Sequence, residues 1–462
     1  MSSTPQPALR RAIRPFDAAA LVVGSMIGSG IFIVSAESAR RTGTPSGLLG
    51  VWIAAGLLTI VASLSCAELA AMLPRAGGQY VFFREAYGPL AGFLFGWSML
   101  TVIQTGTIAA VAVAFARFTG VLVPAVSGEA LFALGPLRVS AVQLLAIAVI
   151  ALLTATNATG LAAGTRTQNV LTVVKVGSLV ALAAAALALG RATGGEAAPG
   201  AAPLGWAFAP AFAAAMVGPL FSQSAWNNVT FAGEEVEDPG RTLPRALLAG
   251  CAAVTILYVA TNAGYLRALT FDEIRHAPED RVGTAAARAL FGPPGAVAMA
   301  AAIMVSTFGC VNGLILSGGR VGFAMARDGL LFRGLSRLNA AAVPARALWL
   351  QAAWAALLVL SGTYSQLLRY VISADILLYA LLVFAVIALR RRRPEWPRPF
   401  RAPLYPWLQV LYIAAVLALI ALLLAADPRA TWPGYAVLLL GVPVYLLWRR
   451  RAASILRASG PR

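Results

Sequence analysis

The stretch GSMIGSGIF, from Gly24 to Phe32, interrupts the first long apolar segment of the chain, residues 16–38. Five of the seven residues from Gly24 to Gly30 are glycine or serine, and three glycines within one helix cost roughly 3 kcal/mol relative to alanine. A membrane span tolerates non-helical backbone only where that backbone is buried in protein or lines an aqueous cavity. The stretch predicts a broken helix facing a central site, although small residues are also typical of a kink or a tight helix contact.

The composition is that of a membrane protein. Of the 462 residues 59% are hydrophobic and 12% are charged, and the mean hydropathy is +0.78, far above that of soluble domains. Runs long enough to cross a bilayer predict an all-α membrane protein with twelve transmembrane helices in one domain, at residues 16–38, 48–72, 90–116, 139–158, 168–190, 207–232, 244–266, 294–318, 345–362, 366–389, 405–426 and 433–448.

The distribution of arginine predicts the orientation. The polar residues 1–15 lack the apolar core and cleavage site of a signal peptide. An even number of spans places both termini on one side, and most arginines of the predicted loops fall on that side, which the positive-inside rule assigns to the cytoplasm. We expect a multi-pass protein of the plasma or inner membrane, with cytoplasmic tails 1–15 and 451–462. The net charge of +18 is spread over short loops, which argues against nucleic-acid binding.

Cysteine and histidine usage argues against an enzyme or a metal site. Cys66, Cys251 and Cys310 all fall inside apolar segments, where a reduced thiol behaves as a small hydrophobic group. The only histidine, His276, lies in a predicted outer loop. It cannot form a metal cluster with the cysteines or activate a nucleophile within the membrane. No cofactor and no covalent chemistry is expected.

Lys175 is the only lysine among 36 basic residues, and it lies well inside the fifth apolar segment. Ionisable groups within spans are costly and suggest function by default. Unlike a guanidinium, an ammonium group can lose its proton when it is desolvated. The alternative is a lysine whose stem extends along the helix to the membrane interface.

The sixth apolar segment repeats the pattern of the first. It meets Gly218 and Pro219 and then reads LFSQSAWNNVTFAGEE, which is too polar for a helix that faces lipid. Interrupted spans at corresponding positions of two halves are typical of inverted-repeat transporters that bind substrate near the bilayer midplane. This pairing favours a broken helix over a kink at Gly24–Gly30.

Four stretches carry a resemblance: GSMIGSGIF, GGQYVFFREAYGP (77–89), FSQSAWNNVTFAGEEVEDPGRTLPRAL (221–247) and STFGCVNGLILSGGRVGFAMARDGLL (306–331). They resemble the amino acid/polyamine/organocation superfamily, most closely the L-type amino acid transporter light chains and their stand-alone bacterial relatives. The resemblance implies a five-plus-five inverted repeat, the LeuT-like fold, with helices 1 and 6 broken. The repeats would be about 16–190 and 206–390 within a permease domain 16–450, with two extra helices at 405–448.

The resemblance also implies a substrate site. Backbone N–H groups of Gly28, Ser29 and Gly30 would hold the substrate carboxylate, in accord with the affinity of helix N-termini for anions. Phe221 matches the family's aromatic lid over the substrate, or it is an ordinary packing residue. The α-ammonium group would be held by carbonyls, with candidates Met26, Ile27, Phe221, Ser222 and Ser224.

Lys175 matches the lysine that stands in place of sodium in sodium-independent members of the superfamily. By this analogy its ammonium group would join carbonyls of the first span near Gly24 to Ser306, Thr307 or Cys310 on the eighth span. Loss of its proton would loosen the first span from the eighth, which gives a physical route to opening.

The chain departs from the light chains in two places. Residues 117–138 contain no cysteine, so no disulfide-linked ancillary subunit is expected. Asp375 stands in the tenth apolar segment, where it would contact a cationic substrate, tune a proton step or reach outer water. A second acid, Glu68, lies within about one turn of the predicted cytoplasmic end of the second segment and belongs either to an inner gate or to the headgroup region.

The sequence therefore predicts a secondary amino acid transporter that works by alternating access. We expect sodium-independent transport of neutral L-amino acids, as a proton-coupled symporter or an antiporter. One alternative is a carrier for cationic amino acids or polyamines. An alternative of another class is a transporter-like amino acid sensor, which usually carries an added soluble domain.

Overall fold

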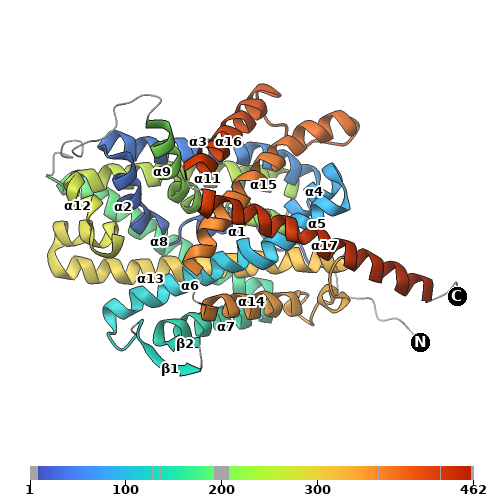
Figure 1. The fold of residues 1–462 in the computed structure, drawn as a ribbon, viewed down its shortest axis with the longest axis horizontal. Helices are drawn as coiled ribbons and strands as arrows, with labels where there is room; N and C mark the ends of the chain where they lie inside the picture. The colour runs from blue at the N-terminus through green and yellow to red at the C-terminus, as the bar shows by residue number, and fades with distance from the viewer. Residues whose placement is uncertain are drawn as a thin grey trace.

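The computed structural model describes residues 9–126, 128–134, 137–191, 208–361, 364–426 and 428–458. Within these ranges the chain is mostly helical, and the long helix α13 (Val282–Arg327) runs across the bundle from one end to the other (Figure 1). Helix α12 (Phe271–Arg275) lies at one end, and the C-terminal part of α17 (Pro428–Ala458) lies at the opposite end (Figure 1). We call these the α12 end and the α17 end.

The first apolar segment forms two helices that meet at an angle of 41°. Helix α1 (Pro15–Met26) ends before the predicted break, and α2 (Gly30–Thr42) begins after it. A proline in the first turn favours the start of α1, and Gly43, with φ of 67°, ends α2 in a left-handed conformation. The chain is thus broken at the stretch that the sequence singled out.

The remaining helices before residue 191 follow the predicted segments closely. Thr44 caps the first of them, α3, by accepting a hydrogen bond from the Gly47 amide at 3.0 Å. The elements are α3 (Pro45–Met72), α4 (Gln79–Tyr87), α5 (Pro89–Ser98), η1 (Met99–Ile103), α6 (Gln104–Leu122), α7 (Ala141–Thr159) and α8 (Leu161–Leu189). Between α6 and α7 an antiparallel hairpin, β1 (Ala130–Leu134) and β2 (Leu137–Ser140), pairs Ala133 with Arg138, a feature that the sequence analysis did not predict.

The second half of the chain also begins with an interrupted helix. Helix α9 (Ala209–Ser222) ends early, and the short α10 (Asn228–Phe231) follows a non-helical connection. The other elements are η3 (Gly233–Glu235), α11 (Pro239–Ala268), η4 (Pro278–Asp280), η5 (Arg333–Ser336), α14 (Ala345–Ser361), α15 (Tyr364–Arg392) and α16 (Trp407–Ala426).

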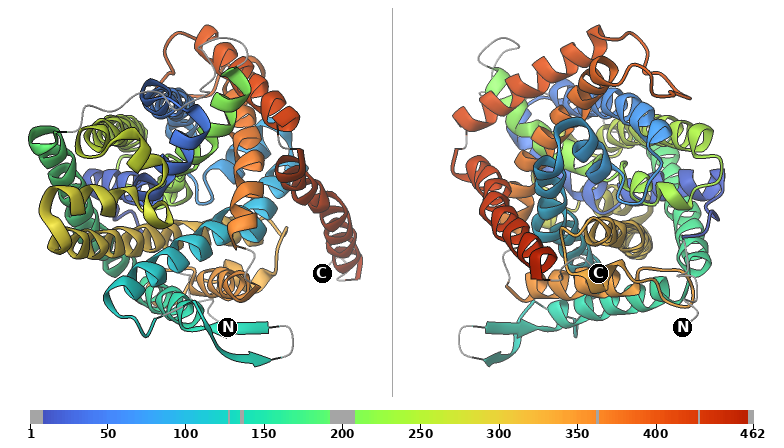
Figure 2. Two further views of the ribbon diagram at one scale, coloured as in Figure 1. Left: turned by 60° about the vertical axis from the view of Figure 1, so that its left-hand side comes forward. Right: turned by 90° about the vertical axis from the view of Figure 1, so that its right-hand side faces the viewer.

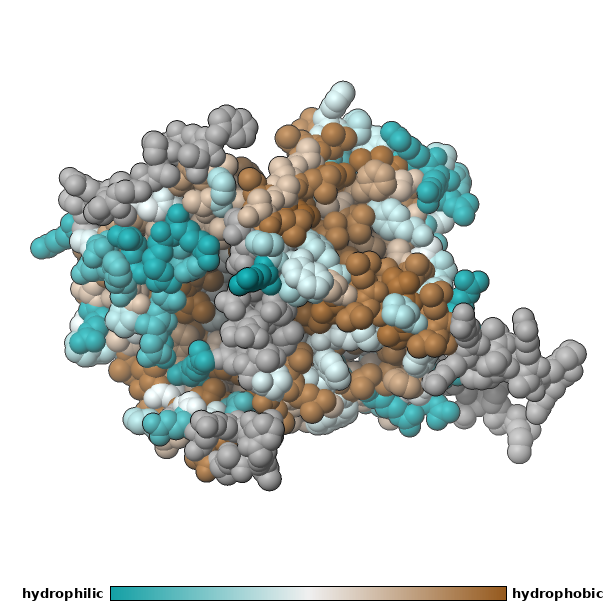
Figure 3. Space-filling view, viewed as in Figure 1, coloured by the Kyte–Doolittle hydropathy of each residue, from teal (hydrophilic) through white to brown (hydrophobic). Residues whose placement is uncertain are grey.

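The helices have the length and composition of membrane spans. Among the described residues, eight helices are long and apolar enough to cross a membrane, or nine with the bent pair α1–α2. All twelve predicted apolar segments coincide with helices or helix pairs, although the number that cross the membrane stays a prediction. Figure 3 shows hydrophobic residues gathered over the middle of the molecule and hydrophilic residues around the α12 end and at the opposite margin.

Packing puts the broken helix in the interior. Helix α1 packs against α8, α11 and α13, and α2 packs against α9, whereas α16 and α17 lie at the edge of the bundle in both views of Figure 2. The three cysteines are buried free thiols, as expected. The non-helical residues 27–29 are therefore surrounded by protein. This is necessary because non-helical backbone within a membrane cannot face lipid.

Candidate functional site

The break in α1 lies against the end of α9. A Cβ atom added to Gly30 would lie 2.2 Å from Ser222 Oγ and 2.8 Å from Ser222 Cβ, so only glycine permits this approach of α2 to α9. The corresponding atom at Gly28 would lie 3.3 Å from Cys310 Sγ, which is less crowded. Gly30 is therefore a close-packing position, whereas a methyl group at Gly28 would need only a small shift of Cys310.

The connection between α9 and α10 is the second interruption. Pro219 lies inside α9, and Ala225 adopts a φ of 65°, a left-handed conformation that stops helix propagation. The Ser222 hydroxyl donates back to the Gly218 carbonyl at 2.9 Å, and the Ser224 hydroxyl donates to the Phe221 carbonyl at 2.7 Å. Both interruptions that the sequence predicted are present and lie next to each other.

Tyr258 of α11 joins the two interruptions. Its buried hydroxyl lies 3.1 Å from the Met26 carbonyl and 3.3 Å from the Ser222 carbonyl. Trp52 packs edge-on against its ring, with 5.4 Å between centroids. The sequence analysis missed this residue, because a tyrosine within an apolar segment gives no local signal that distinguishes it from core.

Lys175 of α8 meets the carbonyls of the broken helix. Its Nζ atom lies 2.5 Å from the Gly24 carbonyl, 2.9 Å from the Ile27 carbonyl and 3.4 Å from the Ser306 carbonyl. The residue is 1% exposed, so it does not extend to a membrane interface. A buried ammonium group held by oxygens from α1 and α13 is the arrangement that the sequence predicted.

The expected partners on α13 behave differently from one another. The Ser306 hydroxyl donates to the Gly28 carbonyl at 3.0 Å, and Cys310 Sγ lies 3.1 Å from the Ser25 carbonyl. The Thr307 hydroxyl instead donates to Ile303 within its own helix at 2.8 Å. Ser306 and Cys310 thus contact α1 with their side chains, whereas the Thr307 hydroxyl is directed to α13.

Most of the carbonyls that were predicted to bind the substrate ammonium group already lie within hydrogen-bond distance of protein donors. Besides the bonds from Lys175 and Tyr258, the Phe221 carbonyl accepts the Ser224 amide at 3.0 Å. A carbonyl oxygen has two lone pairs. An ammonium group at this site would therefore share oxygens with protein donors, at Met26, Ile27, Phe221 and Ser222.

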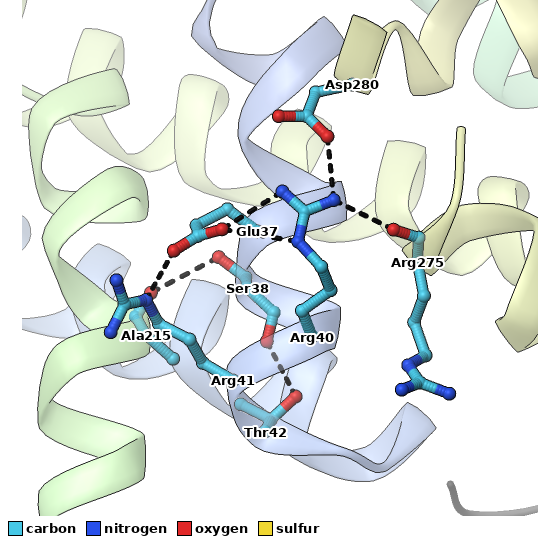
Figure 4. Close-up of polar contacts among 8 residues, drawn as sticks. All are labelled: Glu37, Ser38, Arg40, Arg41, Thr42, Ala215, Arg275 and Asp280. Carbon is cyan, nitrogen blue, oxygen red and sulfur yellow. Dashed lines mark hydrogen bonds and ion pairs between the residues drawn. The ribbon is translucent and has the colours of Figure 1, made fainter. Parts of the chain in front are cut away.

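A cavity of about 430 Å³ reaches the break. Ser29, Gly30 and Phe221 line it together with α6 residues and with Asp280 and Arg281 near the α12 end. At this end Arg40 of α2 donates to Asp280 at 2.7 Å and to the Arg275 carbonyl at 2.8 Å (Figure 4). The cavity thus connects the start of α2 with polar groups at the α12 end.

A second, small cavity of about 30 Å³ shares Phe221 as a lining residue with the larger cavity. Asp375, Gln223 and Ser224 line the small cavity. The Tyr379 hydroxyl donates a hydrogen bond to the Asp375 carboxylate. Asp375 therefore lies close to the α9–α10 connection.

Glu68 lies apart from the breaks. Its carboxylate pairs with Arg390 at 2.5 Å and with Arg398 at 3.4 Å, and it accepts the Ala402 amide at 2.8 Å. The residue is 1% exposed. This cluster fastens α3 to the chain between α15 and α16, and a role of Glu68 in a gate stays a prediction.

Polar contacts join the chain segments at the α17 end. Arg320 and Glu235 form a fully buried ion pair at 2.6 Å, and Ile13 forms a β-bridge with Val236. Arg320 was expected in a loop, but α13 continues to Arg327. Burial raises the pKa of the neighbouring Glu234 carboxyl, but hydrogen bonds from Arg327 and from a backbone amide outweigh it, and the net direction is down.

Two adjacent helix breaks, a buried lysine between the first break and α13, and a cavity that reaches this break are typical of a membrane transporter. The amino acid permease family model matches residues 13–445, and the chain belongs to this family. The chain is therefore an amino acid transporter and not an enzyme. The resemblance drawn from the sequence is confirmed.

Curated relatives cover nearly the whole chain. The serine/threonine exchanger SteT of Bacillus subtilis is 30% identical over 96% of this chain and 98% of its own length. The human large neutral amino acids transporter small subunit 2 is 31% identical over 95% of this chain and 81% of its own length. The mouse Asc-type amino acid transporter 1 is 28% identical over 97% of this chain and 84% of its own length.

Proposed function

We propose that this transporter carries neutral L-amino acids through a site at the two helix breaks, by alternating access and without sodium. The observation that carries the proposal is the junction of α1, α9 and α13 around Lys175 and Tyr258. Helices that end in the interior offer free backbone groups for a zwitterion, and such ends are typical of transporter sites.

The substrate carboxylate binds the backbone N–H groups at the start of α2. The first N–H groups of a helix lack partners within it, and the helix dipole favours an anion there. Ser29 and Gly30 line the larger cavity, so their amides lie within reach of a solute. Phe221 covers the bound amino acid from α9.

Lys175 supplies the positive charge that holds α1 against α13. Its contacts with Gly24, Ile27 and Ser306 resemble the ligand shell of a cation, and a fixed ammonium makes a sodium ion unnecessary. When these carbonyls separate from the lysine, α1 is free to move relative to α13.

The architecture in this proposal is a five-plus-five inverted repeat of the LeuT-like type. The repeats are about 16–190 and 206–390, and two further helices follow at 405–448. The α17 end, with both tails, faces the cytoplasm, and the lipid bilayer of the cell membrane covers the apolar band. The carrier works without a disulfide-linked subunit.

Neutral substrates are favoured by the similarity to a serine/threonine exchanger and to a large neutral amino acids transporter subunit. The rival is a carrier of cationic amino acids or polyamines that binds them at Asp375. A cavity of about 30 Å³ has room for one or two water molecules, which is too small for a lysine or arginine side chain.

The test is a substrate panel in proteoliposomes that contain the purified protein. We expect labelled serine to enter in sodium-free buffer, with unlabelled neutral amino acids competing and arginine, lysine and putrescine not competing. Empty liposomes are the control for leakage. Competition by the cationic solutes alone would favour the rival, and binding of amino acids without uptake would favour a sensor.

A further inference from the structure

Two acidic side chains, Glu68 and Glu235, are fully buried, and a third, the half-buried Asp375, lacks a cationic partner among the described residues. Glu68 and Glu235 are each 1% exposed, and each pairs with arginine, at 2.5 Å and 2.6 Å respectively. Among the described residues, no arginine or lysine nitrogen lies within 4.0 Å of the Asp375 carboxylate. The fold thus neutralises two interior carboxylates with fixed charges and leaves the third without one.

The groups around Asp375 are polar but uncharged. On its own helix the hydroxyl of Tyr379 donates to it, and α16 contributes Tyr412. The non-helical segment after α9 contributes Gln223 and Ser224. None of these groups supplies the positive charge that a permanently ionised carboxylate needs at this depth.

Titratable groups from the packed elements are few. The cysteine on α3, Cys66, is a buried free thiol, and it supplies no positive charge to this cluster. Trp226, just before α10, stacks on the Tyr379 ring with 5.2 Å between centroids. Lys175 is engaged with carbonyls of α1 and α13 instead. The ligand that neutralises Asp375 therefore has to come from solution.

The size of the cavity identifies the class of that ligand. About 30 Å³ accommodates one or two water molecules, so a proton delivered through water fits, whereas a substrate side chain does not. Phe221 lines both this space and the larger cavity that reaches Ser29 and Gly30. A movement of Phe221 on substrate binding would change the access of water to Asp375.

We propose that Asp375 is a proton-binding site that couples amino acid uptake to proton entry. The inference rests on the proposed function and adds the co-transported ion. The carboxylate takes a proton from a hydronium ion or water on the α12 side, which forms an O–H bond at Asp375. It returns that proton to water on the α17 side after the helices rearrange, so one proton accompanies each turnover.

The test follows pH inside proteoliposomes loaded with a pH-sensitive dye. Addition of serine outside should acidify the lumen in wild type. Asp375→Asn keeps the size and hydrogen bonding of the side chain but cannot exchange a proton. We expect this variant to retain counterflow of labelled serine within about threefold, without serine-driven acidification and without pH dependence of uptake. Asp272→Asn, on the exposed α12 surface, is the matched control and should behave as wild type.

A second variant tests how Asp375 is positioned. Tyr379→Phe removes the hydroxyl that donates to the Asp375 carboxylate. Loss of this hydrogen bond destabilises the ionised carboxylate and so favours the protonated form of Asp375. The midpoint of the pH profile of serine uptake should therefore move to higher pH, with acidification retained. A merely structural role for Tyr379 would lower the rate without moving the midpoint.

The outcomes separate this inference from the proposed function. Acidification that persists in Asp375→Asn overturns the assignment of the proton to this residue. Counterflow by wild type without any acidification also overturns it and leaves an exchanger with the proposed site intact. A wild-type protein that neither exchanges nor takes up any amino acid overturns the proposed function as well.

Discussion

At the scale of single residues, the site depends on contacts too close for ordinary side chains. Gly30 allows α2 to begin directly against Ser222, and the Tyr258 hydroxyl lies within hydrogen-bond distance of the Met26 and Ser222 carbonyls, on both sides of that contact. A buried carbonyl that loses its donor costs about 1–3 kcal/mol. The geometry of the two breaks is therefore maintained by a small number of specific atoms.

The two glycines of the break should respond differently to a methyl group. Gly30→Ala places Cβ on Ser222 and forces α2 away from α9, whereas Gly28→Ala meets only Cys310 Sγ at 3.3 Å. We expect serine uptake to fall by about tenfold or more in Gly30→Ala, on the order of 1–3 kcal/mol of overpacking, and by much less in Gly28→Ala. Initial uptake rates normalised to protein amount measure this.

A second-site change supplies the control. Ser222→Gly removes the atoms that the new methyl group would strike, so Gly30→Ala combined with Ser222→Gly should recover part of the lost uptake. If Gly30→Ala transports like wild type, the close approach of α2 to α9 is not required for function.

Sequence reasoning found those site residues whose chemistry is unusual for their surroundings. A lone lysine in an apolar segment and a run of glycines in another are costly in a membrane, so Lys175 and Gly30 could be predicted. Tyr258 could not, because a tyrosine is ordinary in a helix and its partners lie far away in the sequence. The orientation of α13 about its own axis decides which of Ser306, Thr307 and Cys310 contact α1 with their side chains, and the sequence does not give this orientation.

At the scale of elements, α13 connects the site with the α17 end. One part of this helix meets Lys175 through Ser306, and further along Arg320 pairs with Glu235 beside η3. Nearer the end of the helix, Arg327 pairs with Glu234 at 3.1 Å. Helix α13 thus forms one buried and one half-exposed ion pair with η3. These two pairs allow a matched comparison.

The buried pair should matter far more than the exposed one. Arg320→Met leaves Glu235 charged and unpaired in the interior, at a cost of about 3–5 kcal/mol. Arg327→Met breaks a half-exposed pair worth up to about 1 kcal/mol. We expect a large fall of the apparent melting temperature in detergent for the first variant and a small one for the second. Equal effects would contradict a buried, desolvated pair.

Segment positions could be predicted from hydropathy, whereas local details could not. The apolar runs coincide with helices because burial in lipid or protein favours them. Arg320 was expected in a loop because an arginine ends an apolar run, yet Glu235 neutralises it and α13 continues to Arg327. The β1–β2 hairpin joins residues without a strong alternating pattern, so hydropathy alone gave no signal for it.

At the scale of the whole molecule, α8 meets α1 and α13 at the buried Lys175 side chain. Lys175 lies on α8, its carbonyl partners lie on α1 and α13, and the larger cavity approaches the same junction from the α12 end. In the proposed mechanism the carrier opens to one side at a time, and loss of the lysine contacts would permit the change. Transport without sodium is the central claim.

The most direct measurement is counterflow of labelled serine in sodium-free proteoliposomes, with wild type, Lys175→Ala and Lys175→Arg compared at equal protein amounts. Wild type should exchange serine at the same rate with and without sodium. Lys175→Ala should lose at least about tenfold in rate, or ~1.4 kcal/mol, while remaining folded by its size-exclusion profile. Lys175→Arg should not restore the rate, because a planar guanidinium does not fit a site for a compact ammonium group. Exchange that requires sodium, or wild-type exchange by Lys175→Ala, would contradict the account.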